Sequence, residues 1–361
     1  MPPLLLLAAL LACAHVRVPD VDPVRLVAPL LGSVPAYPAH VPDAALVEDA
    51  AARRLRGDLE GARGVLAFVL ARETPSPAEA EALYQLGLCY EAEEETEVAL
   101  AVYDRLVRTF PDAPVSQDGW FRRALCLESL GAHRQAVRSL ERIRTSQGLD
   151  RHDRYTLDLQ RGISLVRSGR RNKGLRLLDD ALAATSDTEE VTYLRAKAYL
   201  TRARVWAEAA ARIRFTGPDR RQARRLEERA TYLRHAEAEV TAATALKEPE
   251  WILEGLLLLG RAYEDLRSDL LQASPPRGFS EEGVARWQAE LETRTRILGT
   301  KAWRHYDEGV ALAGRLGWVG RPLAELRAAR AAIRLEALVK PPASDAPPAE
   351  HASESDQSLP L

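Results

Sequence analysis

The sequence of 361 residues is poor in the residue patterns that build catalytic and metal sites. It has three cysteines and seven histidines, and none of them falls in a Cys-x-x-Cys or His-Glu-x-x-His pattern. A glycine-rich phosphate loop ending in lysine is also missing. We therefore predict that the protein is not an enzyme and that it binds no metal and no cofactor.

Net charge and aromatic residues are also low. The formal net charge is −2, so no strong overall field attracts nucleic acid, and we expect no nucleic-acid partner. Aromatic residues make up 6% of the chain, while alanine, leucine, arginine and glutamate dominate, a composition that favours helices. The composition therefore predicts an all-α protein.

The apolar run Leu4–Cys13 is too short to span a membrane, because a spanning helix needs about 20 apolar residues. Its length is typical of a signal-peptide core. Its end, Leu10-Leu11-Ala12-Cys13, resembles a bacterial lipobox, in which the cysteine becomes lipidated. The resemblance implies a signal peptide over residues 1–13, a lipid on Cys13, and a place in the cell envelope on the periplasmic side of the outer membrane.

No lysine or arginine precedes the apolar run, which departs from the signal-peptide pattern. The alternative is an apolar N-terminal helix in a cytosolic protein. Residues 14–42 contain six prolines and are predicted to form an extended tether. Residues 339–361, rich in proline, alanine, serine and aspartate, are predicted to be a disordered tail.

Residues 83–111, LYQLGLCYEAEEETEVALAVYDRLVRTFP, resemble a tetratricopeptide repeat, a hairpin of two helices. Gly87 and Ala99 are small where the two helices should cross, and Tyr103 should fill the space between them. Pro111 should end the hairpin because proline cannot continue a helix. The resemblance implies an α-solenoid, a stack of such hairpins.

The small crossing residue recurs along the chain. Ala62, Ala99, Ala136 and Gly174 are separated by 37, 37 and 38 residues, close to the family period of 34. We therefore predict four repeats over residues 43–188. The lengthened repeats, with a Phe-Pro-Asp-Ala-Pro link at residues 110–114, resemble those of bacterial outer-membrane assembly lipoproteins.

The pattern is less regular after residue 190. Residues 189–338 are predicted to form elongated hairpins and a capping helix. Helices are expected over 191–214, 219–247 and 320–337, and Gly260 and Tyr306 are expected to belong to a hairpin with an insertion of about thirty residues. The segments 301–306, 317–318 and 323–326 (KAWRHY, GW and LAEL) weakly resemble, over roughly forty residues, the ends of myxobacterial gliding-motility repeat proteins.

The family resemblance also implies a binding surface. In tetratricopeptide proteins the first helices line the concave face at fixed repeat positions. Eleven residues, which we call the partner row, fall on those positions: Val47, Arg54, Tyr84, Leu88, Glu91, Phe121, Leu125, Glu128, Leu159, Ile163 and Arg167. The row is apolar and aromatic at its centre with a carboxylate edge, and the alternative is that a segment of the same chain covers it.

Two other features have structural interpretations. Cys89 and Cys126 lie one repeat apart, where equivalent positions on packed helices are about 8–10 Å apart, too far for a disulfide. We expect two buried, reduced thiols. The arginine-rich stretch 202–234 has interleaved acidic residues and is expected to be a solvated, salt-bridged face.

These resemblances together imply a periplasm-facing lipoprotein that holds an envelope assembly together by binding other envelope proteins or peptides, with a lipid anchor in the membrane. Outer-membrane biogenesis, motility and secretion machines are the assemblies that the resemblances suggest. A cytosolic scaffold or regulator and a non-catalytic accessory subunit of a cell-wall enzyme are the alternatives.

Overall fold

The computed structural model describes residues 40–72, 76–143, 149–186, 191–215, 219–275 and 278–333. Over these residues the secondary structure is helical, with no strand, which confirms the predicted all-α class. None of the described helices is both long and apolar enough to cross a membrane. The chain divides into unit 1, Met1–Ala184, and unit 2, Thr185–Leu361. Cys13, the tether to residue 39 and the tail from residue 334 lie outside the described residues.

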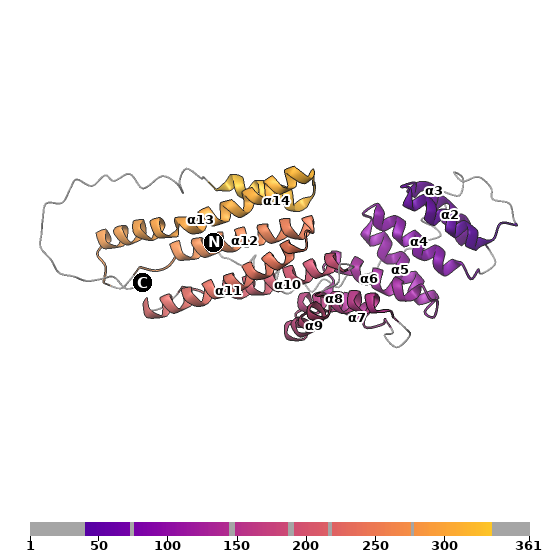
Figure 1. Cartoon of the computed structure of the whole chain (residues 1–361), viewed down its shortest axis with the longest axis horizontal. Helices are drawn as coiled ribbons and strands as arrows, with labels where there is room; N and C mark the ends of the chain where they lie inside the picture. The colour runs from indigo at the N-terminus through magenta and orange to yellow at the C-terminus, as the bar shows by residue number, and fades with distance from the viewer. Residues whose placement is uncertain are drawn as a thin grey trace, which may run out of the picture. The chain divides into compact units, whose positions relative to one another are not determined.

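Unit 1 is a series of antiparallel helical hairpins, in which each hairpin packs against the next (Figure 1). Its helices are α2 (Asp43–Leu55), α3 (Leu59–Leu70), α4 (Glu79–Ala92), α5 (Thr96–Thr109), α6 (Ser116–Ser129), α7 (His133–Leu140), α8 (Arg151–Arg167) and α9 (Arg171–Ala184). Aspartates cap two of these helices: the Gly61 amide donates to Asp58 Oδ1 (2.9 Å) and the Asp153 amide donates to Asp150 Oδ1 (2.7 Å).

The core of unit 1 follows the predicted repeat. Tyr103 on α5 is completely buried, and a Cβ built on Gly87 of α4 would collide with its ring. Ala62, Ala99 and Ala136 are also completely buried. A Cβ at Gly174 would lie 2.7 Å from the Val166 amide nitrogen, so α8 and α9 approach too closely even for alanine. The crossing residues are therefore small for the predicted reason.

The turn inside each hairpin has one residue in the left-handed conformation. Gly57, Gly131 and Gly169 have φ values of 84°, 75° and 91°, and the equivalent turn residue of the second hairpin is Glu94, with φ of 62°. These four positions keep the repeat spacing of 37, 37 and 38 residues. Glutamate has a Cβ and meets a steric penalty that glycine avoids. Three of the four repeats thus use the favoured residue.

Replacing Glu94 with glycine is therefore expected to stabilise unit 1 by about 0.5–1 kcal/mol, because relief of left-handed strain outweighs the extra chain entropy of glycine. Native-state hydrogen exchange of the α4 and α5 amides measures this change. The matched control is Arg105→Gly, an exposed position in the interior of α5, which should lose about 1 kcal/mol. Equal destabilisation by both variants would contradict the turn argument.

The described helices of unit 2 are α10 (Thr192–Ala211), α11 (Asp219–Ala245), α12 (Pro249–Leu271), α13 (Glu281–Leu316) and α14 (Arg321–Ala332). All but α14 are longer than any described helix in unit 1 (Figure 1). α10 pairs with α11, α12 pairs with α13, and α14 packs against both α12 and α13. The Gly283 amide donates to Ser280 Oγ (3.2 Å), so Ser280 caps α13.

The α12/α13 hairpin repeats the core contact of the α4/α5 hairpin on a longer scale. Tyr306 is completely buried, and a Cβ built on Gly260 would collide with its ring. Tyr306 follows Gly260 by 46 residues, whereas Tyr103 follows Gly87 by 16 residues. The inserted residues lengthen both helices around an unchanged crossing point, and the prediction for Gly260 and Tyr306 is confirmed.

The interpretation of the arginine-rich stretch is partly wrong. Its ion pairs mainly join different helices rather than neighbours on one helix: Arg202 pairs with Glu239 (2.8 Å) and Arg214 with Asp269 (3.2 Å). Arg229 is only 1% exposed, so it is no part of a solvated face. Its guanidinium pairs with Asp269 at 2.5 Å and lies 5.6 Å from the ring centre of Phe215. Arg229 therefore stabilises the interior of unit 2, whereas Arg212, Arg224 and Arg234 are exposed, as a solvated face requires.

Candidate partner-binding face

The partner row is distributed over the first helix of each hairpin in unit 1, α2, α4, α6 and α8. Four of its residues are buried: Val47, Glu128, Leu159 and Ile163. The other seven are partly exposed: Arg54, Tyr84, Leu88, Glu91, Phe121, Leu125 and Arg167. Any partner lying on this face would therefore contact mainly α4 and α6, where four of the seven are apolar or aromatic.

Tyr84 and Leu88 on α4, with Phe121 and Leu125 on α6, form the apolar part of the row, which we call the apolar patch. Each is half-buried. The Tyr84 ring lies 6.1 Å from the ring of Tyr103, which anchors it to the core beneath. Burial raises the pKa of the Tyr84 hydroxyl, although the neighbouring Arg122 lowers it, so the hydroxyl stays protonated and can donate.

Polar side chains beside this patch form a ladder from one first helix to the next. Arg54 Nε donates to Gln85 Oε1 (3.3 Å), and Arg122 Nη1 donates to Glu91 Oε2 (3.1 Å). In both pairs the two residues are 31 positions apart: Gln85 follows Arg54, and Arg122 follows Glu91. Residues at the twelfth repeat position thus contact the sixth position of the following repeat.

The next step of the ladder is buried. Glu128 is 5% exposed and accepts hydrogen bonds from Gln160 and Arg167, the latter at 3.0 Å, while the Ser164 hydroxyl lies 3.4 Å from its carboxylate. These donors compensate for burying the charge. The sequence predicted a carboxylate edge, and the structure shows that Glu91 and Glu128 each pair with an arginine of the next first helix, Arg122 on α6 and Arg167 on α8.

Carboxylates remain at the N-terminal ends of α4 and α6. Burial raises the pKa of Asp118, the nearby Asp153 and Glu81 raise it further, and Arg122 opposes them. Glu81 accepts from Gln85 Nε2 (2.9 Å). The acidic edge of the face therefore lies at Glu81 and Asp118, which the partner row does not include.

Sequence reasoning missed Gln85 and Arg122, the ladder partners. Their signal was the 31-residue spacing from Arg54 and Glu91, which becomes meaningful only once the stacking of successive first helices is known.

Cys89 and Cys126 are buried and free, as predicted, and burial raises the pKa of their thiols to about 11 and about 12. Within the described ranges, no three histidine, cysteine, aspartate or glutamate side chains cluster as metal ligands would.

Residues 81–113 match the family model of the tetratricopeptide repeat. The chain thus contains a tetratricopeptide repeat, and the resemblance identified from residues 83–111 is confirmed.

Two solved structures are similar to the chain. A tetratricopeptide repeat protein from Parabacteroides merdae has 15% identity and a TM-score of 0.48, covering 85% of this chain and 91% of that one. A tetratricopeptide repeats protein from Bacteroides fragilis has 13% identity and a TM-score of 0.32, covering 73% and 99%. No curated protein matches the chain.

Proposed function

We propose that the protein is a non-catalytic scaffold that binds other proteins through the first-helix face of unit 1. The observation that carries this proposal is the apolar patch of Tyr84, Leu88, Phe121 and Leu125, which is half-exposed and lies beside the ion pair of Arg122 with Glu91. Aromatic side chains held on a rigid surface are the usual anchors of protein interfaces. Helical or extended peptide segments bind such surfaces through regularly spaced apolar residues.

The ladder supports this function by fixing the surface before a partner arrives. Arg122 joins α6 to Glu91 on α4, so the two helices that carry the patch are connected at its side. Rigid anchors lose little conformational entropy on binding. Glu91 and Glu128 are already paired with arginines of this chain, so they have no free charge to offer a bound protein. We therefore expect the bound protein to place apolar side chains on the apolar patch and any basic side chains near Glu81 and Asp118.

Replacing Tyr84 and Phe121 together with alanine is expected to abolish recovery of the partner from crosslinked cells, since each hot-spot aromatic contributes about 2 kcal/mol or more. The matched control is Tyr193→Ala with Phe279→Ala, which removes two exposed aromatics from unit 2 (45% and 40% exposed). Unchanged recovery with the first variant, while its circular dichroism stays helical, would refute the proposal.

We further propose that the scaffold is lipid-anchored in a bacterial envelope, at the periplasmic side of the outer membrane, where it serves an assembly, motility or secretion machine. Support comes from the apolar run that ends at Cys13 and from the prolines after it. A lipidated Cys13 on a tether would keep the binding face near the membrane surface.

Replacing Cys13 with alanine is expected to abolish palmitate labelling and to release the protein from the membrane fraction, because the acyl chains would have no attachment atom. Metabolic labelling with fractionation measures both. The control is Cys89→Ala, which removes a buried thiol and should leave labelling intact. Labelled, membrane-bound Cys13→Ala protein would rule out Cys13 as the anchor, and unaltered protein that is unlabelled and soluble would favour a cytosolic scaffold. Neither result would affect the proposal for the binding face.

A further inference from the structure

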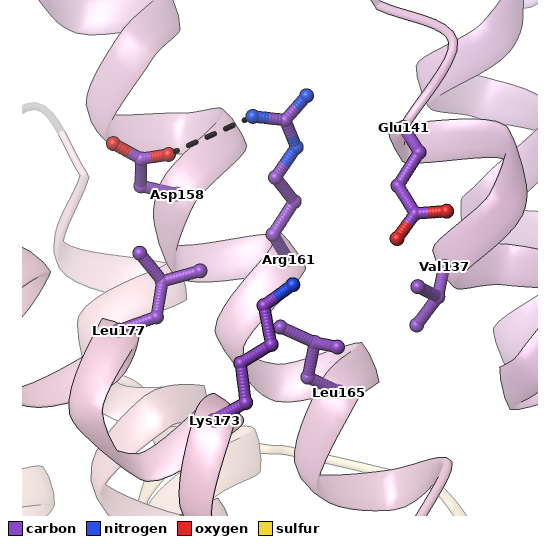
Figure 2. Close-up of a pocket in the computed structure, with 7 residues that line it drawn as sticks. All are labelled: Val137, Glu141, Asp158, Arg161, Leu165, Lys173 and Leu177. Carbon is purple, nitrogen blue, oxygen red and sulfur yellow. Dashed lines mark ion pairs between the residues drawn. The ribbon is translucent and has the colours of Figure 1, made fainter. Parts of the chain in front are cut away.

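A cavity of about 320 Å³ lies in unit 1 among α7, α8 and α9 (Figure 2). It is lined by Val137, Glu141, Asp158, Arg161, Leu165, Lys173 and Leu177. On α8, Arg161 and Leu165 follow the partner-row residues Leu159 and Ile163 by two positions, more than half a helical turn. The cavity is therefore separate from the proposed partner face.

The apolar lining comes from three different helices. Val137 on α7 and Leu165 on α8 are each 4% exposed, so they are fixed by the packing of the hairpins, and Leu177 on α9 is half-buried. Such a lining suits an aliphatic group. One water occupies about 30 Å³ of liquid, so the cavity has room for a group of roughly ten heavy atoms.

Three of the four charges around the cavity already have partners. Arg161 Nη2 donates to the Leu140 carbonyl (2.9 Å), and its Nη1 lies 4.0 Å from Asp158. Glu141 pairs with Arg170 at 3.6 Å. For Lys173, which is exposed, no ion pair or hydrogen bond is formed with any part of the chain that the structure describes. The charge left unmatched is therefore positive.

Figure 2 shows the Lys173 side chain extending from α9 toward the middle of the lining residues, beside Leu165 and below Arg161. Burial lowers the pKa of Arg161, and the nearby carboxylates of Asp158 and Glu141 raise it by less. The two carboxylates therefore do not fully offset the cost of burying the guanidinium charge. An added anion near Lys173 and Arg161 would supply the missing negative charge.

We propose that this cavity binds a small aliphatic carboxylate, with the carboxylate against Lys173 and the aliphatic group against Val137, Leu165 and Leu177. The same chemistry occurs in a free branched carboxylic acid and in the C-terminal residue of a protein that ends in leucine or valine. This site goes beyond the proposed scaffold function and does not depend on it.

The test titrates the full chain, labelled at its leucine methyl groups, with 4-methylvalerate and with the peptide acetyl-alanyl-leucine. Each acid is compared with its uncharged amide. Millimolar binding of an acid, with methyl shifts at Leu165 and Leu177, is expected, and the amide should bind about fivefold more weakly because it cannot pair with Lys173. Tighter binding of the peptide would identify a protein C-terminus as the source, and tighter binding of 4-methylvalerate would identify a free acid.

Lys173→Gln should weaken acid binding about fivefold, whereas Arg176→Gln, an exposed charge on the same helix outside the cavity, should leave it unchanged. Both positions are exposed, so both variants should fold, which circular dichroism verifies. The proposal is overturned if neither acid shifts these methyl groups up to about 50 mM. Equal binding of acid and amide, or Lys173→Gln binding like the unaltered chain, would overturn it as well.

Discussion

Replacing Tyr103 with alanine is expected to lower the free energy of unfolding of unit 1 by about 3–5 kcal/mol, the usual loss for a buried aromatic residue. Tyr103 is completely buried between α4 and α5, and its ring lies directly over Gly87. Removing the ring leaves a cavity that the glycine beneath it cannot fill. The loss should appear as faster hydrogen exchange throughout α4 and α5, because these helices share the contact.

A second substitution distinguishes this contact from a general loss of packing. Gly87→Ala alone should destabilise unit 1, since the new Cβ collides with the Tyr103 ring, but it should be tolerated once Tyr103 is alanine. Leu55→Ala, at a residue 77% exposed, should change stability by less than about 0.5 kcal/mol. If Gly87→Ala had the same effect in both backgrounds, the proposed crossing contact would be incorrect.

Replacing Arg229 with methionine is expected to destabilise unit 2 by about 3 kcal/mol, because breaking a buried ion pair leaves its partner uncompensated. The lost contacts are the ion pair to Asp269 (2.5 Å) and the hydrogen bond to the Ile213 carbonyl (3.3 Å). Asp269 would still pair with the exposed Arg214 at 3.2 Å. The expected loss of stability is therefore near the lower end of the range for broken buried ion pairs.

Hydrogen exchange of the α10–α12 amides measures this effect. Arg234→Met is the matched control, because Arg234 lies on the same helix and is exposed. It should change stability by less than about 0.5 kcal/mol. Similar exchange in the two variants would show that Arg229 is not the buried link between α11 and α12.

The sequence predicted the helical hairpins because small residues recur wherever two helices cross. It did not predict the left-handed turn residue Glu94, since the residue type that signals this conformation is glycine. The role of Arg229 was missed because its partner, Asp269, is 40 residues away on another helix, whereas charge spacing within one stretch reports only local pairs.

The partner-binding face could be predicted only in part. Repeat position correctly indicated that Tyr84 and Phe121 are partly exposed, but it could not reveal that Leu159 and Ile163 are completely buried. Nor could it show that Arg122 covers the negative charge of Glu91, because that contact depends on how consecutive hairpins stack. Whether the eleven residues of the partner row bind a partner stays a prediction.

Site-specific photo-crosslinking in the cells that make the protein tests the central claim most directly. Benzoylphenylalanine would replace Leu88 or Leu125 in the apolar patch and, as a control, Arg105, which is exposed on the second helix α5. The account predicts one crosslinked partner common to positions 88 and 125, and none at position 105. A partner captured at position 105 but at neither patch position would contradict the claim that the first-helix face of unit 1 is the binding surface.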